Sequence, residues 1–268
     1  MKAPAGRLGG PAAAHFDFTV LEETADYLVV NKPAPLQIHP SKPSDAGFTL
    51  WDGLRALLVF ELVNGGQISI INRLDRETSG LVLVAKNTPT ARLFGKAMMR
   101  RQVHKKYLAI VHGWPAWTRI EVDAPILRQG DVRPSEIWVK QCVHESGVPC
   151  QSAFQVRRRF EGLHQGQLER FTLVEAEPHT GRMHQLRVHL AHLGHPVVGD
   201  KLYGVDENCY LEFMRTGWTP ELAERLILAR QALHSHQLTL ETSEGPRTWE
   251  APLTEDLAQF LQVLTAPA

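Results

Sequence analysis

Acidic residues are missing from a long central part of this chain. Lys+Arg and Asp+Glu both number 29 over all 268 residues, so net charge alone indicates no partner. Between Glu77 and Glu121, however, there is no acidic residue. A segment with charge of only one sign produces a local field that attracts polyanions, although a charge run is more often a solvated helix face. The basic residues of this acid-free window are Lys86, Arg92, Lys96, Arg100, Arg101, Lys105, Lys106 and Arg119.

Cysteine is scarce, and long apolar runs are absent. None of the three cysteines belongs to a C-x-x-C pair, which suits a reducing compartment and argues against a structural zinc site. No apolar run approaches the ~18 residues that a membrane-spanning helix needs. Residues 1–15 also lack the apolar centre of a signal peptide. We therefore expect a cytoplasmic protein that has no membrane partner.

Two common nucleotide-binding patterns are absent as well. Neither G-x-G-x-x-G nor G-x-x-x-x-G-K occurs, which argues against a Rossmann or a P-loop site. His184, His189, His192 and His195 invite a zinc hypothesis, but they lack the i, i+4 ligand spacing and the nearby carboxylate of a catalytic zinc helix. We expect neither a metal nor a cofactor.

The length and the composition predict one globular domain. With 43% hydrophobic and 22% charged residues, the chain can bury a substantial core. Residues 1–15 are rich in Ala, Pro and Gly, which predicts a disordered tail. We expect a single domain over residues 16–268, without an additional N-terminal RNA-binding module.

A loop between two apolar segments contains the most informative residue. Ile68–Ile71 and Leu81–Ala85 are typical of strands covered on both faces. Between them, Asp75 lies in a polar segment that ends in Thr-Ser-Gly. Such a carboxylate is either a turn residue that caps its own backbone or a rigidly positioned catalytic group.

Helical spacing and turn residues predict three helices. Apolar residues recur at helical spacing over 49–63 before Gly65-Gly66, and Thr88-Pro89 opens a second helix that extends to about residue 102. Met183, Leu186, Leu190 and Leu193 predict one face of a third helix, which ends at Gly194. Strands are expected over 16–20, 27–30, 105–113 and 171–177, and an irregular segment over 114–150.

Four motifs resemble the RluA family of RNA pseudouridine synthases. The family pattern His-Arg-Leu-Asp-Arg-x-Thr-Ser-Gly is matched over 73–80, with Asn72 in place of the usual His. Residues 31–40 resemble the first family motif, with Pro35 in place of its glycine, and 105–113 match Lys-x-Tyr-x-Ala-x-Val-x-Gly. Over 180–204 the chain follows Thr-Gly-Arg-x-His-Gln-Ile-Arg-x-His-Leu…Gly-Asp-x-x-Tyr-Gly. Residues 233–235 also resemble the Leu-His-Ala sequence with which a strand of the family begins. In all, the resemblance extends from about Phe16 to Leu261.

The resemblance implies a fold and a reaction. The fold would be α+β, a bent and largely antiparallel mixed sheet flanked by helices and loops. The reaction would detach a flipped-out uracil from its ribose and rejoin it through carbon, without a cofactor. Asp75 would be the catalytic aspartate, which either attacks the sugar or acts through elimination. Tyr107 would stack on the base and help to remove a proton, and Arg182 would pair with Asp75 and keep it ionised.

The same resemblance, together with the charge distribution, implies a set of RNA contacts. Lys32 is either a surface lysine before a turn or a contact to a phosphate or a loop. The other RNA-binding candidates are Arg73, Arg76, Arg100, Arg101, Lys105, His184, Gln185 and Arg187. We expect a monomer that acts on ribosomal or transfer RNA. The rival hypothesis is an inactive RNA-binding module of the same fold, which would have no reason to retain a carboxylate that repels phosphate.

Overall fold

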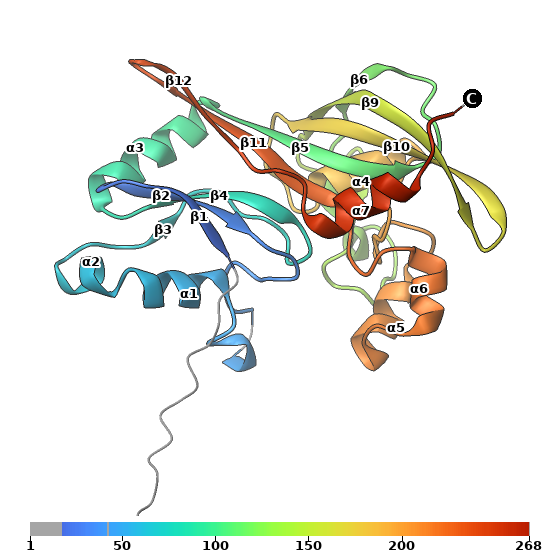
Figure 1. The fold of residues 1–268 in the computed structure, drawn as a ribbon, viewed down its shortest axis with the longest axis horizontal. Helices are drawn as coiled ribbons and strands as arrows, with labels where there is room; N and C mark the ends of the chain where they lie inside the picture. The colour runs from blue at the N-terminus through green and yellow to red at the C-terminus, as the bar shows by residue number, and fades with distance from the viewer. Residues whose placement is uncertain (1–17, 42, 268) are drawn as a thin grey trace, which may run out of the picture.

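One mixed sheet extends through the part of the chain that the structure, a computed structural model, describes: residues 18–41 and 43–267 (Figure 1). The strand order is β1-β2-β4-β11-β5-β10-β9-β6, with β3 paired to β4 and β12 paired to β11. Strand β4 runs parallel to β11, and the other neighbouring strands of this sheet pair in antiparallel fashion. The strands are β1 Thr19–Glu23, β2 Tyr27–Lys32, β3 Ser69–Ile70, β4 Ser79–Ala85, β5 Val103–His112, β6 Arg119–Asp123, β9 Gln151–His164, β10 Gln167–Pro178, β11 Leu233–Thr242 and β12 Gly245–Glu250.

Helices cover this sheet, and a small ribbon lies beside it (Figure 1). The ribbon consists of β7 (Ile126–Arg128) and β8 (Gln141–Val143), with a 3-10 turn, η2 (Gln129–Asp131), between them. Another 3-10 turn, η1, spans Pro43–Asp45. None of the helices in the described ranges is both long and apolar enough to span a bilayer. The helices are α1 Leu50–Leu57, α2 Val59–Val63, α3 Thr88–Met99, α4 Gln185–His192, α5 Asn208–Thr216, α6 Pro220–Leu226 and α7 Glu255–Val263.

Strands β2 and β4 carry side chains into two cores, one on each face. Successive strand residues point to opposite faces, so Val82 and Val84 pack with α1, whereas Leu81 and Leu83 pack with α3. Every residue of β4 is buried. Each fully buried Leu or Val contributes about 1.5–3 kcal/mol to folding. The prediction of a strand covered on both faces is therefore confirmed for β4. For Ile68–Ile71 it is wrong, because β3 spans only Ser69–Ile70 and is half-buried.

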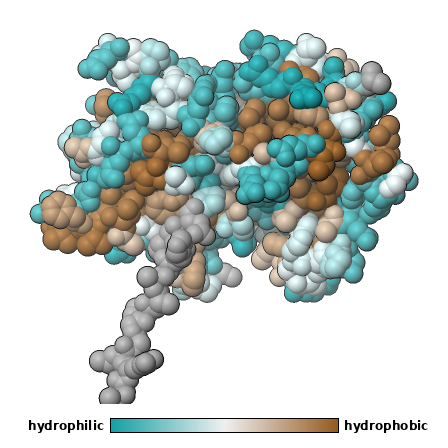
Figure 2. Space-filling model, in the orientation of Figure 1, coloured by the Kyte–Doolittle hydropathy of each residue, from teal (hydrophilic) through white to brown (hydrophobic). Residues whose placement is uncertain are grey.

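The helix predicted over 49–63 is divided in two. Thr49 caps α1 by accepting a hydrogen bond from the Asp52 amide. Leu58 lies between the helices with φ −99° and ψ 30° and is buried, whereas Leu57, another apolar residue of the segment, is 47% exposed. Figure 2 shows apolar side chains gathered over this part of the surface, which includes Phe60 and Val63.

The two halves of the sheet meet where β4 runs parallel to β11. Ser79 pairs with His234 and Gly80 with Ser235. Gly80 has φ +112°, and a Cβ on it would lie 2.2 Å from the Ser235 carbonyl oxygen, so only glycine allows this approach. The predicted α+β class, a largely antiparallel mixed sheet with helices, is confirmed. The predicted tail over 1–15 and the start of the domain at 16 lie outside the described residues.

Candidate active site

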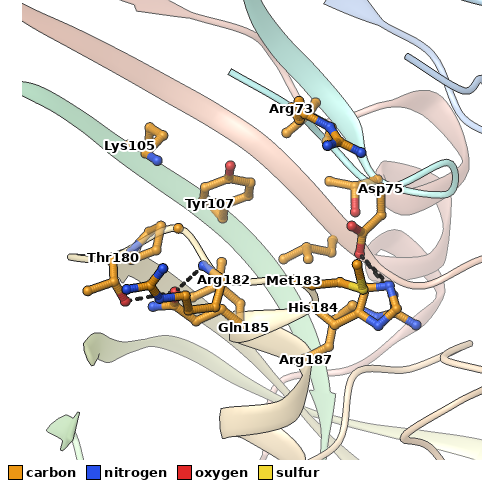
Figure 3. Close-up of a pocket in the computed structure, with 16 residues that line it drawn as sticks. Arg73, Asp75, Lys105, Tyr107, Thr180, Arg182, Met183, His184, Gln185 and Arg187 are labelled. Carbon is orange, nitrogen blue, oxygen red and sulfur yellow. Dashed lines mark hydrogen bonds and ion pairs between the residues drawn. The ribbon is translucent and has the colours of Figure 1, made fainter. Parts of the chain in front are cut away.

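A cleft of about 250 Å³ lies where the loop after β3 faces β5 and the start of α4 (Figure 3). Asp75 borders one side and Arg182 the other, with Tyr107 between them (Figure 3). This volume lies just below the range of roughly 300–1,000 Å³ that is typical of small-molecule sites. The lining residues come from segments that are distant in sequence, so the cleft exists only in the folded chain.

The loop that carries Asp75 is held in place by its backbone and its neighbours. The carbonyl of Arg76 accepts hydrogen bonds from the Leu36 amide at 3.0 Å and from the Lys32 ammonium at 3.3 Å. Glu77 forms an ion pair of 2.8 Å with the buried Lys201. Because the loop is tethered directly after Asp75, the carboxylate is positioned before any ligand arrives.

Asp75 pairs with Arg187, which is buried and shared between two carboxylates. Nη1 of Arg187 donates a hydrogen bond of 2.8 Å to Oδ2 of Asp75. Its Nε and Nη2 donate to the two oxygens of Asp200 at 2.6 and 2.8 Å. This two-pronged contact fixes the plane of the guanidinium and therefore the direction from which it reaches Asp75.

The environment keeps Asp75 ionised. Burial alone would raise the pKa of its carboxyl, but the charge of His184, when that ring is protonated, and the charge and hydrogen bond of Arg187 together lower the pKa below its usual value. Burial lowers the pKa of His184 itself to about 4. The imidazole is therefore neutral at pH 7, so Arg187 supplies the charge that matters there.

His184 is held by Tyr203. Its Nδ1 lies 2.8 Å from the Tyr203 hydroxyl, which also accepts a hydrogen bond of 2.9 Å from the Gln141 amide. Nε2 of His184 lies 4.0 Å from Asp75 Oδ2. His184 adopts a left-handed backbone with φ 56°, an uncommon conformation for a residue with a side chain.

Tyr107 provides the aromatic wall of the cleft. It is buried in β5 opposite Ser235 of β11, and its ring lines the cleft beside Leu233. Burial raises the pKa of the Tyr107 phenol to about 12, and the Asp75 charge acts in the same direction. The phenol is therefore protonated at neutral pH in the free protein.

A family model described as RNA pseudouridylate synthase matches residues 26–192, more than half of the chain. The matched range contains Asp75, Tyr107 and Arg187. This chain belongs to the RNA pseudouridylate synthase family. The family is a family of isomerases, and the predicted membership in its RluA branch is confirmed.

Relatives of known name agree with this assignment. The chain is 33% identical to ribosomal large subunit pseudouridine synthase D of Nitrosomonas europaea over 91% of this chain but only 64% of that protein. It is 34% identical to the Bacillus subtilis RNA pseudouridine synthase YlyB over 94% of this chain and 74% of that one. Among solved structures, human RNA pseudouridylate synthase domain containing 1 matches with a TM-score of 0.65 at 26% identity, covering 97% of this chain and 100% of that chain.

The expected partner of Asp75 was the wrong arginine of this motif. Arg182 is exposed, and its Nε donates to the Pro149 carbonyl at 3.4 Å rather than to Asp75. Gln185 fixes the turn before α4, because its Oε1 accepts hydrogen bonds from the Arg182 amide and the Thr180 hydroxyl. Arg187, predicted to contact RNA, is 5% exposed and pairs with Asp75 instead.

Two more predicted RNA contacts are buried. Lys32 is fully buried, and its Nζ donates to the carbonyls of Pro33, Leu36 and Arg76. Burial lowers its pKa to about 7. Gln185 is 4% exposed and donates to the Gln151 carbonyl and the Ser152 hydroxyl. Both side chains therefore hold protein segments together and are not available to phosphate. His184 is half-buried, and its ring bonds to Tyr203 rather than projecting outward.

The other predicted contacts remain accessible. Arg73 and Arg76 flank Asp75 on the exposed side of the loop, and Arg100 and Arg101 are exposed at the end of α3. Lys105 lines the cleft, and burial lowers its pKa. Within residues 18–41 and 43–267, no ion pair to a carboxylate involves any of these five side chains, so they can meet phosphates.

Several residues of the site were missed in the sequence, although a signal for them existed. Asp200 and Tyr203 belong to the Gly-Asp-x-x-Tyr-Gly motif, and Gln231 precedes the Leu-His entry of β11. Gln231 donates to Thr78 at 2.7 Å and to Asp75 at 3.4 Å. Asn72, the departure from the family pattern, is buried; it donates to the Leu81 carbonyl and accepts from the Leu83 amide, which joins the loop to β4.

Three of the four histidines of the zinc hypothesis, His184 among them, have hydrogen-bond partners within the protein. His189 lies within 3.0 Å of the Ser152 hydroxyl and the Ala124 carbonyl, and His195 lies 2.9 Å from the His112 carbonyl. The described ranges contain no group of three or more His, Cys, Asp or Glu side chains arranged to hold a metal ion.

Proposed function

We propose that this protein isomerises uridine to pseudouridine in a structured RNA, with Asp75 as the catalytic carboxylate. The observation that carries the proposal is the pair of Asp75 and Arg187 at one end of a cleft whose wall is the Tyr107 ring. Family membership supplies the reaction class, and the geometry supports the roles of these three residues.

The target uridine must leave its stack to enter the cleft. A glycosidic bond inside a helix cannot be reached by a side chain, so the nucleotide is flipped out at a cost of a few kcal/mol. The cleft volume suits one base, with Tyr107 and Leu233 providing apolar contact to its face. Arg73 and Arg76, beside Asp75, are positioned to bind the phosphates of the displaced strand.

Asp75 acts as an anion. It either attacks C1′ of the ribose or takes the proton next to it, and in both routes the bond from C1′ to N1 of uracil breaks. The base then turns and forms a bond from C5 to C1′, C5 loses its proton, and N1 gains one, so no oxidant or reductant is needed. With a pKa of about 12, Tyr107 is a neutral phenol before binding, so it can take the C5 proton only after passing its own to another group.

Ribosomal RNA is the target class that we favour. The relatives of this chain in Nitrosomonas europaea, Haemophilus ducreyi and Yersinia pestis are named as pseudouridine synthases of the large ribosomal subunit. Transfer RNA is the other class within the proposal. A catalytically inactive RNA-binding module is the rival function.

The test is the production of pseudouridine by purified protein. RNA from cells that lack this gene is incubated with the wild-type protein or with Asp75→Asn, and pseudouridines are then mapped. We expect new pseudouridines with the wild-type protein and a loss of at least about 1,000-fold in rate with Asp75→Asn, because the amide keeps the shape but not the charge. Glu121→Gln, a carboxylate change on the exposed face of β6, serves as the control and should retain activity. A wild-type protein that binds RNA but makes no pseudouridine would support the inactive module.

A further inference from the structure

A tryptophan outside the cleft is largely exposed, and an arginine supports one face of its ring. Trp138 lies in the connection between β7 and β8 and is 75% exposed, whereas the adjacent Ile137 is 3% exposed. The guanidinium carbon of Arg128 lies 3.7 Å from the centroid of the Trp138 ring and covers one face of it. With so large an exposed fraction, the opposite face of the ring is open to solvent.

The arginine behind the ring is itself fixed. Nε of Arg128 donates a hydrogen bond of 3.1 Å to Oδ1 of Asp131, and its Nη2 donates to the same oxygen. A guanidinium held in this way keeps the indole in one orientation. Trp138 therefore presents to solvent a flat, apolar and preoriented face of the kind on which a planar ligand stacks.

The ribbon that carries Trp138 is continuous with the cleft. Three residues after Trp138, the Gln141 amide donates to the Tyr203 hydroxyl, which holds His184 beside Asp75. The Gln141 side chain also reaches the sulfur of Met183, a residue that lines the cleft. Three residues of extended chain span at most about 11 Å. Trp138 is thus within reach of nucleotides that neighbour a base bound in the cleft.

We propose that Trp138, supported by Arg128, is a stacking platform for an unpaired base of the substrate RNA. This inference rests on the proposed function, because it takes the cleft as the site of the flipped uridine. Every base has a π-face that can stack on an indole, but a base inside a duplex already stacks on its neighbours. The substrate class is therefore an RNA in which the target uridine lies in a loop or bulge with a second unpaired nucleotide beside it.

The test compares two RNA probes. One is a fluorescein-labelled hairpin with a uridine-containing loop, and the other is a fully paired duplex of equal length. Trp138→Ala should raise the Kd for the hairpin about five- to 150-fold, which corresponds to about 1–3 kcal/mol for one stacked base. Its effect on the duplex should stay below about twofold. Trp138→Phe, which retains a ring, should lose less hairpin affinity than Trp138→Ala. Arg128→Ala leaves the ring unsupported, so its hairpin affinity should lie between those of wild type and Trp138→Ala.

Phe60→Ala is the matched control, because Phe60 is an equally exposed aromatic residue on α2, and it should change neither affinity. An unchanged hairpin affinity in Trp138→Ala, or an equal loss for hairpin and duplex, would overturn the platform. A failure of the proposed function would be seen separately, as the absence of pseudouridine with the wild-type protein. Hairpin binding can be measured in either case.

Discussion

Charged side chains at the inner end of the cleft, around Asp75, differ from those at its rim in burial and in pairing. At the inner end, Arg187 is buried between Asp75 and Asp200, and each charge has an opposite partner within 2.8 Å. At the rim, Arg73, Arg76, Lys105 and Arg182 form no ion pair to a carboxylate within residues 18–41 and 43–267. Paired and buried charges fix the geometry of the reacting group, whereas cations without a carboxylate partner remain available to a flexible polyanion. We infer that the inner end serves catalysis and the rim serves binding.

The largest expected effect comes from replacing Arg187, the arginine of the inner end, with lysine. Arg187→Lys keeps a charge but loses the two-pronged contact to Asp200, and a shift of about 1 Å in Asp75 costs about 100-fold in rate. We expect at least that loss in the single-turnover rate at saturating RNA. Arg182→Lys, the matched change at the rim, should retain a rate within about threefold of wild type. Equal losses in both variants would remove the distinction between inner end and rim.

The second effect concerns the stability that the inner end provides. Asp200→Ala leaves Arg187 with only one partner, and breaking a buried pair costs about 3–5 kcal/mol in the free energy of unfolding. Urea denaturation at pH 7 measures this difference.

The pH dependence of that difference is a further part of the test. Burial raises the pKa of Asp200, but Arg187 lowers it more, so the folded value lies below the unfolded one. Its contribution is therefore complete above the unfolded pKa of about 3.9 and is lost as the pH falls through the folded value. The difference in the free energy of unfolding between wild type and Asp200→Ala should therefore become smaller below about pH 4. A gap that does not change with pH would mean that packing, not charge, carries the effect.

A third and smaller effect is expected at Asn72. Its amide satisfies two backbone groups of β4, so Asn72→Ala should cost about 1–3 kcal/mol of stability, because it leaves buried groups unpaired. RNA affinity should not change, because this side chain is buried away from the rim. Titration with labelled RNA below the melting temperature of the variant measures its RNA affinity while it is folded, and so separates an effect on affinity from the effect on stability. A specific loss of affinity would mean that Asn72 contributes to RNA placement.

The smallest effects belong to single cations at the rim and at the end of α3. Charge reversal at Arg100, Arg101 or Lys105 should weaken binding severalfold for all RNA sequences alike, and removal of one phosphate-binding cation should reduce the salt dependence of log Kd by about one. Arg119→Glu, on β6 at the other end of the sheet and already 3.8 Å from Glu121, should leave the affinity unchanged. RNA binding that is insensitive to salt would place the RNA on another surface.

The sequence was sufficient for the elements whose determinants are local. The apolar run of β4 predicts a strand from neighbouring residues, and the family motifs identified Asp75 and Tyr107 as candidates. The Thr-Ser-Gly segment, expected as a turn, instead enters β4 at Ser79. Local patterns failed where burial is nearly complete. In α4, Gln185 through Leu190 are all buried, polar residues included, so an apolar stripe could not separate inner from outer positions. Met183, assigned to that stripe, precedes the helix and is 55% exposed.

Only the tertiary structure decided which arginine meets Asp75. The two candidates are five residues apart in one motif, and both lie more than 100 residues from the aspartate, so no spacing rule distinguishes them. Gln185 holds the backbone amide of Arg182, whose guanidinium meets the Pro149 carbonyl, while Asp200, 13 residues after Arg187, anchors the other guanidinium. The sequence determined that a carboxylate and an arginine would be present. Their pairing depends on hydrogen bonds between segments that become neighbours only when β4, α4 and β11 pack around one cleft.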